Sequence, residues 1–302
     1  IREINSGILA LDAAAMKQMV AEIEPENAQA EYYLTDLVAM AVDRDLPVRG
    51  LVSEEADEVS GINDRVQLAD AERLFQRRAA ADLMRAGVTM ADPARVDIRG
   101  NISAGEDCFI DINVVLEGKV HLGSGVRIGP GSVIRDSSLA EGVTVEAHTL
   151  VEGADVAARC SLGPFARIRP GTILGEEVRI GNFVETKKAK LGRGTKASHL
   201  SYLGDATLGE DCNVGAGTVT CNYDGIDKHP TEIGDNVFVG TNSTLVAPVE
   251  IGSGAFVAAG STVTTKVAEG DLAVGRGKQR NISGWTRPDK RARPDQPKNK
   301  ES

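Results

Sequence analysis

Aliphatic residues recur at every sixth position through more than half of the chain, from about Gly100 to Val267. Three runs show the repeat most clearly: Leu116, Leu122, Ile128 and Ile134; Leu162, Ile168, Leu174 and Ile180; and Ile233, Val239, Leu245, Ile251, Val257 and Val263. Neither a helix nor an alternating strand has a period of six. Hexapeptide repeats predict a parallel β-helix, in which each hexad forms one short strand with its aliphatic residue directed inward. Since three hexads complete one coil, residues eighteen apart are expected to stack at the strand spacing of about 4.8 Å.

The pattern before the repeats is irregular. In residues 1–66 it predicts a helix over 13–23, a second helix within 27–41 with Thr35 as its N-cap, and a strand over 47–52. These elements alone are too few to close a hydrophobic core.

A segment of strong helix formers joins this region to the repeats. Residues 67–88 predict one long connecting helix, which Gly87 and Pro93 end. We therefore expect a mainly β chain with four parts: an incomplete α/β domain (1–66), a helical linker (67–99), the β-helix (100–268) and a C-terminal tail (269–302).

Composition narrows the classes of function. The formal charge of -10 argues against nucleic acid or an anionic membrane as the main partner, and no apolar stretch is long enough to span a bilayer. The four cysteines form no C-x-x-C pair, which favours a reducing, cytoplasmic setting over a zinc or redox site. The chain starts at Ile1 rather than methionine, so we expect it to be a fragment.

Two cations are expected to stack on one face of the β-helix. Arg169 and Lys187 are eighteen residues apart, and each follows an inward position. Like charges so close are unfavourable unless an anion lies between them, so the pair indicates a phosphate site with a bidentate Arg and a Lys point charge. Further cations follow at Lys188, Lys190, Arg193 and Lys196, forming a basic patch. The alternative is a solvated charged face.

Three further features could belong to the same site. His199 occupies the third, outward place of its hexad, where an imidazole could take a proton from an amine; an ordinary surface histidine is the alternative. The period breaks only between Thr220 and Ile233, which predicts an external loop. Thr241 and Ala259, eighteen apart and both small, predict a flat stripe suited to an extended ligand arm.

Specific motifs along the whole chain resemble one family. They are Glu3-Ile-Asn5-Ser-Gly, Asn27-Ala-Gln-Ala-Glu-Tyr-Tyr-Leu-Thr-Asp, Asp92-Pro-Ala-Arg, Gly163-Pro-Phe-Ala-Arg-Ile-Arg169-Pro-Gly, Gly181-Asn-Phe-Val-Glu-Thr-Lys187-Lys, His199-Leu-Ser-Tyr202-Leu-Gly-Asp, Asn213-Val-Gly-Ala-Gly-Thr and Cys221-Asn222-Tyr223-Asp-Gly. They resemble the bacterial enzymes that combine N-acetylglucosamine-1-phosphate uridyltransferase with glucosamine-1-phosphate N-acetyltransferase.

The resemblance implies a left-handed β-helix in a homotrimer with sites between subunits. It implies acetyl transfer from acetyl-CoA to the amine of glucosamine-1-phosphate, for peptidoglycan and lipopolysaccharide precursors. The residues that it implies are His199 as general base; Arg169, Lys187, Tyr202 and Asn213 at the sugar phosphate; and Ala216, Asn222, Tyr223, Thr241, Ala259 and Arg276 at acetyl-CoA.

The uridyltransferase half is where this sequence departs from the family. A Gly-rich loop for the UTP phosphates and an Asp ligand for Mg²⁺ are not found. Asn5 matches a sugar-nucleotide contact and Asn63 matches the second metal ligand. We therefore expect this chain to acetylate only.

Two alternatives are kept open. One is a hexapeptide acyltransferase that acts on another amino substrate and shows no preference for a 1-phosphate. The other is a non-catalytic, trimerising β-helix, which predicts neither a base nor a cation pair beside the external loop.

Overall fold

The protein is described here by a computed structural model, which covers residues 5–26 and 28–287. Its contacts divide the chain into two compact units, Ile1–Arg78 and Ala79–Ser302. Asn27 and residues 288–302, which include most of the second half of the expected tail, lie outside the described residues. No described helix is both long and apolar enough to cross a bilayer.

The first unit contains helices but no strand among its described residues. They are α1 (Ala13–Val20), α2 (Asp36–Asp43) and the short 3-10 helix η1 (Ala56–Val59). Asp12 caps α1 by accepting hydrogen bonds from two backbone N–H groups. Thr35 is the N-cap of α2, as predicted, but its side chain makes no capping bond. The strand predicted over 47–52 is wrong, because this segment has no neighbouring strand with which to pair.

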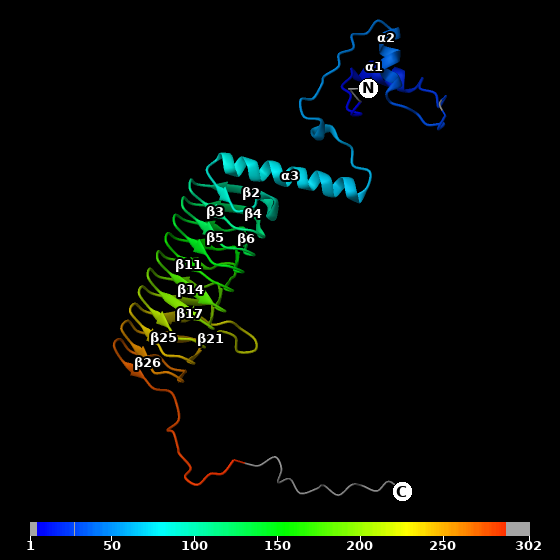
Figure 1. The fold of residues 1–302 in the computed structure, drawn as a ribbon. Helices are drawn as coiled ribbons and strands as arrows, with labels where there is room; N and C mark the ends of the chain where they lie inside the picture. The colour runs from blue at the N-terminus through cyan, green and yellow to red at the C-terminus, as the bar shows by residue number, and fades with distance from the viewer. Residues whose placement is uncertain (1–4, 27, 288–302) are drawn as a thin grey trace, which may run out of the picture. The chain divides into compact units, whose positions relative to one another are not determined.

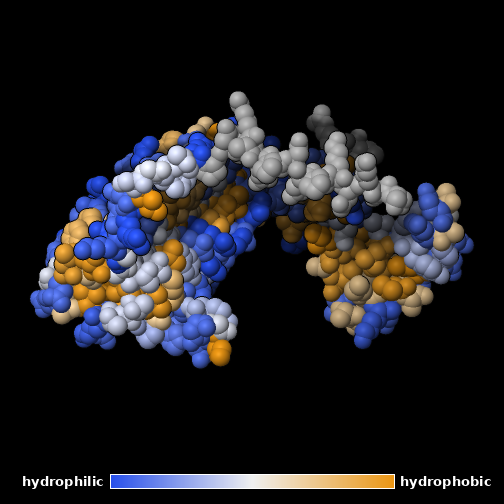
Figure 2. Space-filling view, turned by 90° about the horizontal axis from the view of Figure 1, so that it is seen from below, coloured by the Kyte–Doolittle hydropathy of each residue, from blue (hydrophilic) through white to orange (hydrophobic). Residues whose placement is uncertain are grey.

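The core of this unit is small. Among its described residues, Met19, Leu37 and Ala41 form the buried cluster. Large apolar side chains such as Leu51 and Ile8 remain exposed, and Figure 2 shows the apolar atoms gathered on the surface of this unit. The small cluster and the exposed apolar side chains agree with the expectation that these elements are too few to close a core, which stays a prediction.

The long helix α3 (Arg65–Arg85) leads into the repeats. It begins two residues before the predicted start and ends before Gly87, whose φ of 102° lies in the left-handed region that glycine adopts readily. Ala80 and Leu83 of α3 belong to the core of the solenoid, and Figure 1 shows α3 next to β2 at the start of the coils. A 3-10 helix, η2 (Pro93–Arg95), then turns the chain into the first long strand, with Asp92 as its cap.

The second unit is a left-handed parallel β-helix, as the repeats and the resemblance predict. Figure 1 shows the coils stacked along one axis. Each strand pairs in parallel with the strands of the neighbouring coils, on both sides within the solenoid and on one side at its ends, and the strands form three faces.

The first face is the 11-stranded sheet. Its strands are β1 (Thr89–Met90), β3 (Phe109–Ile110), β5 (Arg127–Ile128), β8 (Thr144–Val145), β11 (Ser161–Leu162), β14 (Arg179–Asn182), β17 (Lys196–His199), β20 (Asn213–Val214), β23 (Phe238–Val239), β26 (Phe256–Val257) and β28 (Leu272–Ala273).

The second and third faces form the 17-stranded sheet, because β2 (Val96–Ala104) and β4 (Val114–Leu122) run through both. The second face continues with β6 (Val133–Arg135), β9 (Leu150–Glu152), β12 (Arg167–Ile168), β15 (Glu185–Lys187), β18 (Tyr202–Gly204), β21 (Val219–Cys221), β24 (Thr244–Val246) and β27 (Thr262–Val263). The third face continues with β7 (Ser138–Leu139), β10 (Asp155–Val156), β13 (Ile173–Leu174), β16 (Lys190–Leu191), β19 (Ala206–Leu208), β22 (Thr231–Ile233) and β25 (Val249–Ile251).

The repeat residues form one continuous core between these faces. The aliphatic residues of the three runs are all buried, and they belong to a single apolar cluster. Each short strand thus contributes one inward side chain, which is why the six-residue period identifies the fold.

The length of the coils varies near the predicted site. Ile168 pairs with Thr186, eighteen residues on, but Asn182 pairs with His199 after seventeen. Val214 pairs with Val239 after twenty-five residues, because the external loop interrupts this coil. The spacing of eighteen therefore predicts stacking correctly for Arg169 with Lys187 and for Thr241 with Ala259, but not around His199.

Candidate active site

A column of charged side chains runs along the end of each strand on the second face. In register, it contains Arg99, Glu117, Arg135, Glu152, Arg169 and Lys187. The signs alternate up to Arg169, and Arg135 bridges Glu117 at 3.1 Å and Glu152 at 3.3 Å. The next place holds Lys187 instead of a carboxylate, so two cations are neighbours there. The alternation of charge therefore breaks at Lys187, where two like charges are held close together.

A third cation reaches the same place from the external loop. Lys228 lies so close to Lys187 that the neighbouring ammonium, followed by partial desolvation, lowers the pKa of Lys228 below its ordinary value. Asp205 is 4.0 Å from the Nζ of Lys187, and Glu185 is 2.7 Å from Arg169. The carboxylates orient these cations, while the pair of ammonium groups still favours a bound anion.

Sequence reasoning missed Lys228. Lys228 lies in the loop that the break in the period predicts. Because the residues of this loop follow no repeat, the sequence does not show which strand the loop covers. The antiparallel bridge between Tyr223 and Lys228 could have been anticipated only from the turn residues between them.

Tyr202 lies beside the cation pair. A Cβ atom added to Gly204 would be 2.3 Å from the phenol oxygen of Tyr202, so the ring lies over this glycine. Gly204 is the register partner of Lys187, and the phenol is therefore a neighbour of the ammonium group. Asn222 is buried and donates a hydrogen bond of 2.5 Å to Asp205, which fixes the start of the loop on the same face.

His199 is the last residue of β17, and it is exposed. Its Nδ1 is 2.6 Å from the amide oxygen of Asn182, one coil below. Because an amide oxygen only accepts, Nδ1 carries the proton and Nε2 keeps its lone pair free. The imidazole is thus held in the tautomer that a general base needs. Asn182 was missed because a spacing of eighteen places Gly181 under His199.

A stripe of small residues continues the His199 column along the solenoid. In register, His199 is followed by Ala216, Thr241 and Ala259. The backbone bonds agree: Asn242 donates to the carbonyl of Ala216 at 2.7 Å, and Gly260 donates to that of Thr241 at 2.8 Å. At the end of the stripe the guanidinium of Arg276 donates to the carbonyl of Ala259. The predicted flat stripe is therefore present, with a cation at its far end.

Tyr223 is exposed on the external loop, where its hydroxyl donates to the carbonyl of Gly225 at 2.6 Å. Asn213 lies elsewhere, on the first face, where it pairs with Lys196 and Phe238. Tyr202 and Lys187 belong to the second face. A single chain therefore does not bring Asn213 to the cation pair.

The basic patch expected after Lys187 is wrong as a single surface. Lys190 belongs to the third face and Lys196 to the first. Arg193 forms ion pairs with Glu210 at 2.9 Å and Asp211 at 3.3 Å. Since consecutive hexads occupy different faces, cations that are close in sequence are separated by the corners.

The residues expected at the uridyltransferase site lie in the first unit. Asn5 is exposed and its side chain accepts from the N–H of Gly7 at 2.8 Å. Asn63 is also exposed, and its N–H donates to Gln67 at 2.7 Å. Among the residues that the structure describes, no three His, Cys, Asp or Glu side chains are grouped as a metal site. Asn63 thus lies beside no such group.

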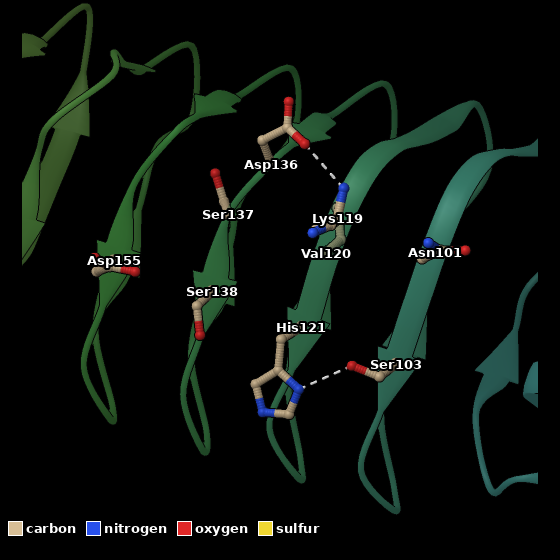
Figure 3. Close-up of a pocket in the computed structure, with 9 residues that line it drawn as sticks. All are labelled: Asn101, Ser103, Lys119, Val120, His121, Asp136, Ser137, Ser138 and Asp155. Carbon is tan, nitrogen blue, oxygen red and sulfur yellow. Dashed lines mark hydrogen bonds between the residues drawn. The ribbon is translucent and has the colours of Figure 1, made fainter.

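A separate groove of about 290 Å³ lies on the third face near the start of the solenoid (Figure 3). His121 lines it and is 2.9 Å from the hydroxyl of Ser103, while Lys119 donates through its N–H to Asp136. None of the predicted site residues lines this groove.

Comparison with known proteins shows what the chain is similar to. The model of the GMPPB C-terminal domain matches residues 98–193, and the model of the bacterial transferase hexapeptide (six repeats) matches residues 230–265. The bifunctional protein GlmU of Marinobacter nauticus is 54% identical over 290 residues, which cover 96% of this chain and 64% of that protein. The chain is a homologue of the bifunctional GlmU proteins.

A second GlmU, from Alkalilimnicola ehrlichii, is also 54% identical and covers 96% of this chain and 63% of its own length. The chain thus spans slightly less than two thirds of these GlmU relatives. Among solved structures, an Arabidopsis UDP-N-acetylglucosamine acyltransferase shares 18% identity over 61% of this chain and 68% of its own, with a TM-score of 0.37. The polySia specific acetyltransferase NeuO shares 19% over 68% and 88%, with a TM-score of 0.28.

Proposed function

We propose that this chain transfers the acetyl group of acetyl-CoA to the amine of glucosamine-1-phosphate. The observation that carries the proposal is the interrupted charge column, where three cations, Arg169, Lys187 and Lys228, gather beside two carboxylates, those of Glu185 and Asp205. A sugar phosphate supplies a further anion. The GlmU relatives, with 54% identity, support the same activity.

The chemistry follows from His199. Its free Nε2 takes a proton from the C2 amine of glucosamine-1-phosphate, and the amine attacks the thioester carbonyl of acetyl-CoA. The tetrahedral oxyanion then collapses, the C–S bond breaks, and CoA leaves as the thiol once it gains a proton. The base typically contributes about 10²–10⁴-fold, and holding amine and thioester together contributes as much or more.

The small stripe is proposed as the acetyl-CoA site. Ala216, Thr241 and Ala259 leave a flat surface that begins at His199, along which an extended arm can lie. Arg276, at the other end, would meet the phosphates of CoA. Asn222 and Tyr223 of the external loop would contact the same cosubstrate.

We further propose that the active unit is a homotrimer. The support is that one chain leaves Asn213 on a different face from Lys187 and Tyr202, so a neighbouring subunit would have to supply it. The chain's cysteines are free, which suits the proposed cytoplasmic location. For Mg²⁺-dependent uridyl transfer the described residues do not fit, because they contain no group of three His, Cys, Asp or Glu side chains that could hold a metal ion.

The test mixes the chain with acetyl-CoA and glucosamine-1-phosphate and follows free thiol. Cys108, Cys160 and Cys212 are buried, and burial raises the pKa of the Cys160 thiol to about 11, while Cys221 is half-buried. A sample without acceptor therefore corrects for the protein's own thiols and for hydrolysis. Thiol release no faster than in that sample would disprove acetyl transfer. Equal rates with glucosamine and glucosamine-1-phosphate would instead favour an acyltransferase with another acceptor.

His199→Ala tests the proposed base. We expect kcat to fall by about two or more decades, the usual contribution of a general base, while sedimentation still shows the oligomer of the unchanged chain. Turnover within a factor of about three of the unchanged protein would remove His199 from this role.

A further inference from the structure

The external loop is a short hairpin that carries three residues of the proposed site. Tyr223 and Lys228 form an antiparallel bridge, and the N–H of His229 donates to the carbonyl of Asn222 at 2.8 Å. Asn222 and Lys228 thus contact Asp205 and Lys187 of the second face, while Tyr223 and the turn from 224 to 227 are exposed.

One carboxylate ties the turn to the end of the hairpin. Oδ1 of Asp224 accepts from the N–H groups of Ile226 and Asp227, at 2.8 and 2.7 Å. Oδ2 of the same residue is 2.7 Å from Nε2 of His229. The bond from His229, followed by the two backbone bonds, holds the pKa of Asp224 well below its usual range.

The loop needs such a restraint because its cation is repelled. Lys228 lies against Lys187, and this neighbour lowers the pKa of Lys228. Without substrate, repulsion between the two ammonium groups favours a loop that moves away from the second face. His229 is the next residue after Lys228, so a bond at His229 acts directly on the position of that lysine.

We propose that Asp224 and His229 are positioning residues, which clasp the external loop so that Lys228 and Tyr223 are already in place when the sugar phosphate and acetyl-CoA bind. This inference rests on the proposed function. It assigns no contact with substrate to either residue.

The clasp is expected to depend on pH. A hydrogen bond from a charged donor to a carboxylate is stronger than one from a neutral donor, and histidine side chains gain a proton between about pH 5 and 8. The clasp is therefore tighter at low pH. The other charged or titratable groups on the loop and on the strands beside it are Asp227, Lys228, Asp205, Lys187, Tyr202 and Glu232.

The experiment measures the Kd of glucosamine-1-phosphate at pH 6 and pH 8 by calorimetry. At each pH the result is expressed as the Kd of the variant divided by the Kd of the unchanged protein. The ratio cancels the ionisation of the ligand and of His199. For His229→Ala we expect a ratio of about three to five at pH 6 and a smaller one at pH 8, the effect of one exposed charge-assisted pair. His121→Ala, at the distant groove of Figure 3, is the matched control with a ratio of one.

Asp224→Asn should reverse the dependence on pH. Its amide oxygen still accepts the two backbone bonds, so the amide NH₂ faces His229 and pairs only with a neutral imidazole nitrogen. Its Kd, relative to that of His229→Ala, should therefore be lower at pH 8 than at pH 6. A purely structural role of the loop would not produce this reversal.

Two outcomes separate the clasp from the proposed function. If the unchanged protein binds glucosamine-1-phosphate and the His229→Ala ratio is one at both pH values, the clasp is disproved. If the unchanged protein does not bind the sugar phosphate, the proposed function fails. Amide exchange of Ile226, Asp227 and His229 then decides whether the clasp exists: faster exchange in His229→Ala supports it, and equal exchange overturns it.

Discussion

Gly204 occupies a place where no side chain fits, because the phenol of Tyr202 lies over it. A Cβ atom there would be 2.3 Å from the hydroxyl oxygen and 2.6 Å from the ring carbon that bears it. The backbone of Gly204 is not in the left-handed conformation. An added methyl group would therefore displace the ring of Tyr202 rather than distort the strand. The ring is a mobile side chain, and it is expected to move away from Lys187.

Gly204→Ala should therefore weaken substrate binding with little loss of stability. We expect KM for glucosamine-1-phosphate to rise about tenfold, the loss of one hydrogen bond to a charged ligand, with an unchanged melting temperature. Tyr202→Phe should have a similar effect, and the double variant should be no worse than either single one. Gly61→Ala, where the methyl group meets no atom within 4 Å, is the control. An unchanged KM would remove the phenol from the sugar-phosphate site.

Single residues of the site differ in how far the sequence could predict them. Arg169 and Lys187 could be placed together because their coil has the regular length of eighteen. Lys228 could not be placed, because the loop that carries it follows no period. Asn182 could not either, since its pairing with His199 depends on a coil of seventeen residues.

The close packing of strand β14 against strand β17 fixes the position of His199. Gly181 precedes Asn182 in β14, and a Cβ atom on it would be 1.8 Å from the carbonyl oxygen of Ser198. This oxygen belongs to the backbone of β17, so it cannot rotate away. Any side chain at Gly181 must separate the two strands.

Gly181→Ala should thus cost both stability and activity. We expect the free energy of unfolding to fall by about 1–3 kcal/mol, as for other overpacked sites, and kcat to fall because Asn182 no longer holds the imidazole. Urea denaturation and the thiol assay measure the two effects. Gly50→Ala, whose methyl group meets no atom within 4 Å, should leave both unchanged. Normal kcat in a clearly destabilised variant would contradict the role of Asn182.

The elements themselves were predictable to different degrees, for physical reasons. Inward aliphatic residues repeat because each short strand buries one side chain, so the period reveals the core of the β-helix directly. The shortened coils are harder to see, since inward Ala197 and Thr186 weaken the aliphatic signal there. The strand expected over 47–52 fails because a strand is stable only with a partner, which the described part of the first unit does not offer.

The proposed site residues lie on separate faces of the β-helix. Asn213 lies on the first face, where His199 is the last residue of β17, whereas Lys187 lies on the second face. If the proposed trimer is correct, Asn213 acts in the site of a neighbouring subunit. Closed assemblies with rotational symmetry place one face of each subunit against another face of the next.

Coexpression of two inactive chains tests this arrangement. Asn213→Ala and His199→Ala are each expected to be nearly inactive alone. In randomly mixed trimers, a site is complete when a chain with intact His199 adjoins a chain with intact Asn213, so about one quarter of the sites should be active. If both residues served the same site from one chain, every site would lack one of them, and the mixture would be no more active than the single variants. Purification through two different tags keeps only mixed trimers, in each of which one site of the three is complete. The thiol assay on this sample then distinguishes recovery to about a third of normal activity from no recovery, and sedimentation shows whether three chains are present.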